Sequence, residues 1–286
     1  MIYDSIVIGK GPAGISAAIY IKRGGLDVLV LGSGAGALER AEKIDNFYGF
    51  PQTVSGKELL DRGLEQAKRL GVTVKTEEVL ALNMEEYFTV VTARGRYETK
   101  TVVFATGKSR VGLKVAGFEE LKGKGISFCA TCDGFFFRDK KLAVVGAGDY
   151  AAHELKDLQA FSQDVTVFTN GEKTVSSLIP ADIPVIHEPI TGFYGSGKLE
   201  SLKTSAGEYP IDGAFIAIGT ANAADFAAKT GIAMEGASIS VNRDFMTNMP
   251  GIFAAGDCTG GLFQIAKAVS DGAQAGLGVV SYLREG

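Results

Sequence analysis

The sequence of 286 residues lacks several features that would define a common functional class. Its formal net charge is −4, so it has no surplus of Lys and Arg for contacts with nucleic-acid phosphates. It contains no run of about 18 apolar residues that would cross a membrane. Residues 3–8 already have the composition of a buried strand and follow no basic segment. We therefore predict no nucleic-acid partner, no membrane association, no signal peptide and a cytoplasmic location.

Histidine and cysteine are also scarce, with two and three residues respectively. A single Cys-x-x-Cys pair and two histidines supply too few ligands for a zinc site, so we predict no metal. The third cysteine, Cys258, is expected to be a small buried apolar residue.

The cysteine pair lies in the segment Cys129-Ala130-Thr131-Cys132-Asp133. Cytoplasmic cysteines stay reduced unless they are redox-active, which makes a structural disulfide the less favoured interpretation. Two cysteines at this spacing can hold two electrons as thiols or release them as a disulfide. The carboxylic acid of Asp133 follows directly and could handle the proton; the alternative for Asp133 is a solvated turn residue. We therefore predict that Cys129, Cys132 and Asp133 are catalytic.

The N-terminal residues have the pattern of a βαβ nucleotide-binding unit. A short apolar strand is expected at 5–8, a helix at 15–23 and a second strand at 27–31, with GKGPAG at 9–14 between the first two. Glycines in this loop permit a tight turn and a close backbone approach to a pyrophosphate at the helix N-terminus. No acidic residue ends the second strand, where Gly32 and Ser33 stand, so this unit alone does not identify the dinucleotide.

A second unit of the same kind follows later in the chain. Its strands are expected at 142–145 and 165–168, with a glycine loop at 146–151 and a helix at 151–161. An amphipathic helix at 57–70, a strand within 251–257 and a helix at 264–283 complete the pattern. The predicted fold class is α/β, with two Rossmann-like nucleotide-binding domains, the second inserted into the first. The first domain is predicted to comprise 1–113 and 245–286, and the second to comprise 114–244.

Five motifs, in order, carry a resemblance to a known family: 8–14, 46–51, 105–107, 129–134, and 256–257 with Gln264. With these motifs the chain resembles the low-molecular-weight thioredoxin reductases over nearly its whole length, of the FAD/NAD(P)-linked disulfide reductase type. The resemblance implies an FAD-binding first domain, a thioredoxin-like protein substrate and a homodimer. It also implies the cofactor-binding residues, which are Gly9, Gly11, Pro12, Ala13, Gly14, Asn46, Ala105, Thr106, Gly107, Gly256, Asp257, Gln264 and Ile265.

The same resemblance implies a role for each residue of the redox segment. Cys132 would face the flavin and accept its electrons, and Cys129 would attack the disulfide of the protein substrate. Asp133 would donate or accept the proton. Thiol–disulfide exchange needs one attacking thiolate and one resolving thiol, which agrees with this assignment.

The second nucleotide unit departs from the family pattern. Members that use NADPH carry an arginine cluster after the strand at 165–168, whereas residues 169–177 here contain no arginine and one lysine beside Glu172. Tyr150 and His153 replace a small serine and a glutamate of the family. We therefore predict that NADPH specificity is lost and that the Tyr150 phenol fills the site. The alternative is that Tyr150 faces solvent and NADH still binds.

With these losses the chain looks most like the ferredoxin-dependent flavin thioredoxin reductases. FAD suits that chemistry because it accepts electrons singly and passes them on as a pair. Basic residues around the cysteine segment would attract an acidic ferredoxin, or steer thioredoxin, or simply be solvated; they are Lys122, Lys124, Arg138, Lys140 and Lys141.

Three other functions stay open at this point. They are an NADH- or NADPH-dependent reductase with an atypical site, a flavin-dependent dithiol oxidase that uses oxygen, and a flavoprotein sensor. The Cys-x-x-Cys-Asp segment disfavours the sensor, and both Asp133 and the Ala-Thr pair between the cysteines favour the reductase over the oxidase.

Overall fold

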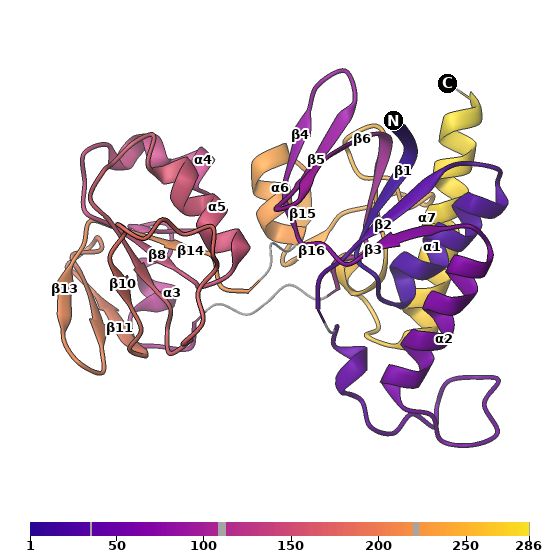
Figure 1. Cartoon of the computed structure of the whole chain (residues 1–286), viewed down its shortest axis with the longest axis horizontal. Helices are drawn as coiled ribbons and strands as arrows, with labels where there is room; N and C mark the ends of the chain where they lie inside the picture. Colours follow the sequence, from indigo (N-terminus) through magenta and orange to yellow (C-terminus); the bar gives the residue numbers. More distant parts are fainter. Residues whose placement is uncertain (35, 108–112, 220–222, 286) are drawn as a thin grey trace. The chain divides into compact units, whose positions relative to one another are not determined.

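The computed structural model describes residues 1–34, 36–107, 113–219 and 223–285. The chain forms two compact units, the first made of Met1–Ser109 with Asn222–Gly286 and the second of Arg110–Ala221. In Figure 1 the first unit carries the colours of both chain ends and the second unit those of the middle, because the second is inserted into the first.

The first unit contains a large sheet and its helices. Its strands are β1 (Ile2–Ile8), β2 (Val28–Leu31), β3 (Thr73–Lys75), β4 (Val79–Met84), β5 (Phe88–Thr92), β6 (Gly95–Phe104), β15 (Met234–Glu235), β16 (Ser238–Ile239) and β17 (Ile252–Ala254). Its helices are α1 (Pro12–Arg23), α2 (Gly56–Arg69), α6 (Ala223–Thr230) and α7 (Ile265–Glu285), with 3₁₀ turns η1 (Leu38–Arg40) and η3 (Gly256–Thr259).

The sheet of this unit has seven strands in the order β3-β2-β1-β6-β5-β4, and β17 also pairs with β6. β1 runs parallel to β2 and β6, with Ile8 opposite both Leu31 and Phe104. β17 is parallel to the last residues of β6, whereas β5 is antiparallel to its first residues. The carboxyl ends of the parallel strands therefore meet at one edge, where ligands of such sheets usually bind.

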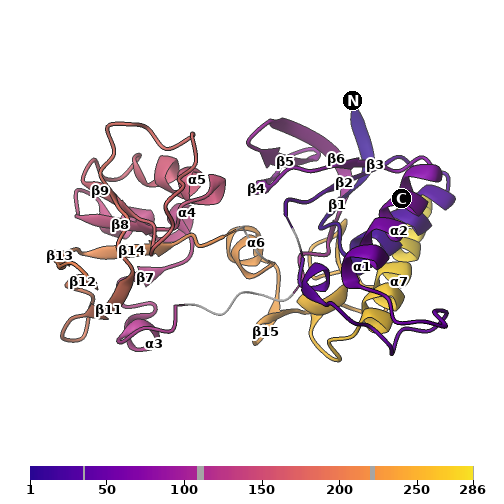
Figure 2. The ribbon, with the colours of Figure 1, turned by 60° about the horizontal axis from the view of Figure 1, so that its bottom comes forward.

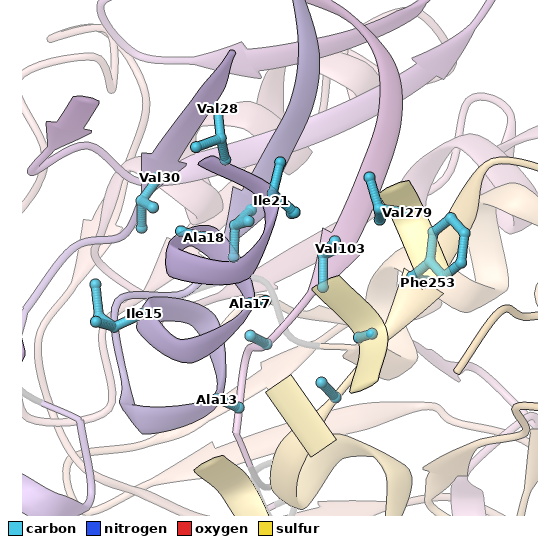
Figure 3. Close-up of a cluster of buried hydrophobic side chains, with 14 of the residues drawn as sticks. Ala13, Ile15, Ala17, Ala18, Ile21, Val28, Val30, Val103, Phe253 and Val279 are labelled. Carbon is cyan, nitrogen blue, oxygen red and sulfur yellow. The ribbon is translucent and has the colours of Figure 1, made fainter. Parts of the chain in front are cut away.

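Helix α7 packs tightly along α1, as both ribbon views show (Figures 1 and 2). Glycine makes this possible, because a Cβ at Gly272 would lie 2.1 Å from the carbonyl oxygen of Ala13. Side chains of α1, α7 and strands of the sheet form a buried cluster of mostly small and β-branched residues (Figure 3), which includes Ala13, Ala17, Ala18, Ile21, Val28, Val30, Val103, Phe253 and Val279. This packing fixes the start of both helices at the edge of the sheet.

The second unit has a parallel five-stranded sheet in the order β10-β9-β8-β14-β7 and an antiparallel sheet of β11, β12 and β13. Its strands are β7 (Ile126–Ser127), β8 (Leu142–Val145), β9 (Val165–Phe168), β10 (Val185–Ile186), β11 (Ile190–Tyr194), β12 (Ser201–Thr204), β13 (Glu208–Pro210) and β14 (Gly213–Ile216). Its helices are α3 (Phe118–Leu121), α4 (Ala130–Asp133) and α5 (Asp149–Leu158), with the 3₁₀ turn η2 (Gly134–Phe137).

The predicted fold class is confirmed, and some boundaries differ from the sequence-based expectation. Helix α5 runs over Asp149–Leu158 rather than 151–161. Helix α1 starts at Pro12 rather than at residue 15, because proline has a helical φ and lacks only an N–H that the first turn would not use. Residues 222–244, predicted to belong to the second domain, group with the first unit. The reason is packing: α6 contacts β4, and β16 contacts η3.

Candidate redox and flavin site

Cys129 and Cys132 form a disulfide at the end of β7, with their Cα atoms 5.3 Å apart. The short helix α4 begins directly after Cys129, and this single turn brings the two sulfurs together. Cys129 is 3 % exposed, whereas Cys132 is exposed on the surface of the second unit. The Sγ of Cys129 accepts the backbone N–H of Cys132 at 3.1 Å and lies 3.4 Å from the Thr131 hydroxyl. These donors would stabilise a thiolate on Cys129 once the disulfide is reduced.

The carboxylate of Asp133 is held beside the cysteine pair by Ser127. The Ser127 hydroxyl donates to Asp133 Oδ2 at 2.6 Å and accepts the Cys129 N–H at 3.1 Å. Ser127 is buried and Asp133 is partly buried, so Asp133 is an anchored carboxylate rather than a solvated turn residue. Ser127 is not among the residues predicted from the sequence, although it stands two residues before the first cysteine.

A second residue that was not predicted, Glu154, binds the backbone amide of Ala130 in the redox turn, residues 129–133. Glu154 on α5 is 1 % exposed, and its Oε2 accepts the Ala130 N–H at 2.8 Å. This bond fastens the redox turn to the helix that follows the second glycine loop. Only the position of Glu154 in that helix could have drawn attention to it.

The glycine loop of the first unit has the geometry that a pyrophosphate requires. A Cβ at Gly9 (φ +121°) would lie 2.1 Å from the Ala105 carbonyl oxygen, and one at Gly14 would lie 1.9 Å from that of Gly9. A Cβ at Gly11, in contrast, would meet no atom within 4 Å, so this glycine borders open space. The N-terminus of α1 has no side-chain cap and no acidic residue in its first turn, which suits an anion.

The other predicted cofactor residues lie around the same edge of the sheet. Asn46 donates from Nδ2 to Gln264 Oε1 at 3.1 Å, although 218 residues separate them, and Ile265 begins α7. Among the described residues, the buried hydroxyl of Thr106 has no hydrogen-bond partner. An uncapped helix start, an open glycine and an unpartnered hydroxyl are what a phosphate-bearing cofactor would complete.

The remaining predicted cofactor-binding residues lie in the elements around the first glycine loop. Pro12 and Ala13 form the first turn of α1, and a Cβ at Gly256 would lie 2.7 Å from the Cβ of Ala13. Ala105 and Gly107 continue from β6, and Asp257 lies in η3. An apolar cavity of about 360 Å³ opens beside Gly11; its lining includes Pro12, Ile15, Ile19, Phe47, Leu59 and Ile265.

The glycine loop of the second unit is covered by its own chain. The Ser176 N–H donates to the Ala147 carbonyl oxygen at 2.7 Å, and its hydroxyl donates to the Asp149 carboxylate at 2.5 Å. Tyr150 is 1 % exposed, so the alternative in which its ring faces solvent is wrong. His153 Nε2 lies 3.8 Å from Asp157 Oδ2, on the same helix.

Cys258 is buried, as predicted, with 1 % of its surface exposed. Its Sγ lies 3.4 Å from the Phe104 carbonyl oxygen and 3.3 Å from that of Ala255. Burial raises the pKa of this thiol to about 11.

Within the described ranges, no group of three or more His, Cys, Asp or Glu side chains is arranged to hold a metal ion. Nor is any helix in those ranges both long and apolar enough to cross a membrane.

Comparison with known proteins identifies the family. The family model of the pyridine nucleotide-disulphide oxidoreductases matches residues 3–272. Thioredoxin reductases of Listeria innocua and Aquifex aeolicus are 33% and 35% identical to the chain, and each alignment covers 99% of the chain and 95% or 94% of the relative. The chain belongs to the thioredoxin reductase family. It is therefore a flavin disulfide oxidoreductase whose cofactor is FAD.

Two solved structures are similar over almost their whole length. The atypical thioredoxin reductase TRi from Desulfovibrio vulgaris Hildenborough is 36% identical, with a TM-score of 0.93 and coverage of 99% of this chain and 98% of that one. A ferredoxin-flavin thioredoxin reductase from Clostridium acetobutylicum is 30% identical, with a TM-score of 0.78 and coverage of 99% of both chains.

Proposed function

We propose that this thioredoxin reductase takes its electrons from ferredoxin rather than from NADPH or NADH, and passes them to thioredoxin or a thioredoxin-like protein. The observation that carries the proposal is the covered glycine loop of the second unit. Ser176 is hydrogen-bonded to the backbone carbonyl of Ala147 and to the carboxylate of Asp149, and therefore lies directly against the loop that a nicotinamide dinucleotide would approach.

The negative charge of Asp149 also disfavours the binding of a nucleotide at this loop. Asp149 lies in the first turn of α5, where the pyrophosphate of a dinucleotide would bind, and two negative groups at close range repel each other. Residues 169–177 supply no arginine to grip a 2′-phosphate. Glu172 is exposed, and as a candidate ribose-binding carboxylate it is the feature that favours NADH as the alternative donor.

The donor is proposed from the chemistry that remains. FAD, when bound, accepts electrons singly and delivers a pair. A one-electron protein donor therefore needs no nucleotide site in the second unit. The structural similarity to a ferredoxin-flavin thioredoxin reductase supports this choice of donor.

The cysteine pair then completes the transfer. Two electrons and two protons convert the Cys129–Cys132 disulfide to a dithiol, with Cys132 facing the flavin. The Cys129 thiolate attacks the thioredoxin disulfide and forms a mixed disulfide, and Cys132 displaces reduced thioredoxin. Asp133, held by Ser127 at 2.6 Å, would move the proton between solvent and these sulfurs. Overall, two reduced ferredoxins and two protons reduce one disulfide.

The assembly and the compartment are part of the same proposal. We place the enzyme in the cytoplasm as a homodimer. The apolar cavity beside Gly11, lined by Ile15, Ile19 and Leu59, supports a self-association surface on the first unit, because apolar surface of this kind is usually covered.

The decisive experiment is an anaerobic titration of the purified flavoprotein, followed by flavin absorbance. Reduced ferredoxin should bleach the flavin, whereas NADPH and NADH should leave it oxidised. A variant with both Cys129 and Cys132 changed to Ser is the matched control: its flavin should still bleach with ferredoxin, but thioredoxin should stay oxidised. Rapid bleaching by NADPH or NADH would overturn the proposed donor. Peroxide formation with a small dithiol, without thioredoxin reduction, would instead favour the oxidase.

A further inference from the structure

Lys267 lies in the first turn of α7, next to η3, and its ammonium group is surrounded by acceptors. It donates to the carbonyl oxygens of Gly256 at 2.9 Å and Gly260 at 2.6 Å, and to Thr259 Oγ1 at 3.0 Å. Its Nζ also lies 2.7 Å from Asp271 Oδ2. An ammonium group has three protons, so these four oxygens use its full donor capacity.

The partner carboxylate, Asp271, is more deeply buried than the acidic partners of the other helix ion pairs at this spacing in the described part of the chain. Asp271 is 5 % exposed, and its Oδ2 accepts the Gly256 N–H at 3.1 Å. An exposed pair spaced by four residues on a helix contributes little, but a buried carboxylate without its cation is strongly unfavourable. Both the N–H and the C=O of Gly256 are therefore held by one ion pair on α7.

These hydrogen bonds to Gly256 fix the orientation of the segment that contains Asp257. In a trans peptide the C=O of one residue and the N–H of the next point in opposite directions. Because the Gly256 carbonyl points to Lys267, the Asp257 N–H points to the other side of the turn. Gly256 also has φ +82°, and a Cβ at this position would lie 2.7 Å from that of Ala13, so the turn packs closely on α1 as well as on α7.

We propose that Lys267 is a positioning residue for FAD: with Asp271, it holds the 256–260 turn in the conformation in which Asp257 meets the cofactor. The ammonium group acts through the turn rather than by touching the flavin. The inference concerns cofactor binding and is independent of which donor reduces the enzyme.

The test is FAD affinity of the apoprotein, measured by quenching of flavin fluorescence. K267M should raise the dissociation constant of FAD at least about tenfold, because three charge-assisted bonds to the turn are lost. K22M is the matched control: Lys22 on α1 makes a 2.8 Å ion pair with Asp27, whose side chain is largely exposed. Its FAD affinity should stay within about twofold of wild type. Wild-type affinity in K267M would overturn the proposal.

A double-variant cycle separates positioning from a general loss of stability. If Lys267 acts through Asp257, K267M should weaken FAD binding in a D257N background by less than about threefold. Fully additive losses would show that Lys267 acts elsewhere and would refute the inference. Should the K267M apoprotein not refold, the FAD content of purified K267Q and K267R holoenzymes replaces the titration. K267R should retain FAD and K267Q should lose it; equal content would contradict the proposal.

Discussion

The buried thiol of Cys258 makes the stability of the first unit depend on pH in the alkaline range. Burial raises the pKa of this thiol from its ordinary value of 9.0 to about 11, although nearby backbone hydrogen bonds and the Lys267 charge act in the opposite direction. We predict that the protein loses stability between about pH 9 and about pH 11 and that C258A removes this loss.

The sign follows from proton counts. Between pH 9 and pH 11 the unfolded chain has released the thiol proton, whereas the folded protein still holds it. The unfolded state therefore binds fewer protons, and a rise in pH favours unfolding in this window. Below pH 9 both states hold the proton, so the contribution is fully present there.

The size of the predicted stability loss follows from the difference between the pKa of the folded-state thiol, about 11, and its ordinary value of 9.0. At about 1.36 kcal/mol per pH unit, this difference of two units amounts to about 2.7 kcal/mol, of which about 2 kcal/mol is lost by about pH 10.5. Because the thiol is fully buried, solvent screening does not reduce this value appreciably.

The assay is urea unfolding of the disulfide-intact wild type and of C258A at about pH 7.5 and about pH 10.5, followed by circular dichroism. Lysines and tyrosines titrate alike in both proteins, so the difference between them isolates Cys258. C258A should lose about 2 kcal/mol less than wild type over this range. Equal losses in the two proteins would refute the reasoning.

Two further predictions concern the redox turn. C132S should trap a mixed disulfide with thioredoxin and C129S should not, because the backbone N–H of residue 132 and the Thr131 hydroxyl stabilise the Cys129 thiolate. Mass spectrometry of the adducts checks this prediction. Trapping by C129S alone would reverse the roles of the two cysteines. S127A should slow thioredoxin reduction about tenfold without changing the rate of flavin reduction, because Ser127 holds Asp133 beside Cys129. Stopped-flow measurement of the two half-reactions separates them, and an unchanged thioredoxin rate would remove Ser127 from the mechanism.

Features that depend on local sequence were predictable. The glycines at 9, 11 and 14, the 129–132 pair and the strands before the two glycine loops combine glycines, cysteines and apolar runs at fixed spacing, and the structure has them where expected. The short strand β7 before Cys129 was not predicted. Cys258 is buried in η3, as predicted, and Tyr150, for which the sequence left a solvent-facing alternative, is buried in the first turn of α5.

Contacts between ordinary residues far apart in the chain were not predictable. Glu154 meets Ala130 across 24 residues, and Ser176 meets Asp149 across 27. Serine and glutamate occur throughout any sequence, so only the folded chain shows which of them carries such a contact. The same holds for residues 222–244, which carry no nucleotide motif and join the first unit solely through packing.

The glycines of the second loop have a consequence for the interpretation of genomes. A Cβ at Gly146 would lie 2.1 Å from the carbonyl oxygen of Ala217, so this glycine is required for the approach of two strands whether or not a ligand is present. Selection for folding alone can therefore preserve the first glycine of a dinucleotide signature without any ligand, whereas a Cβ at Gly148 would come no closer than 3.5 Å to another atom. Surveys that count such signatures will overestimate the number of nicotinamide-dependent enzymes. The residues that pack on the loop, rather than the glycines within it, are the better positions to compare when related chains are sorted by electron donor.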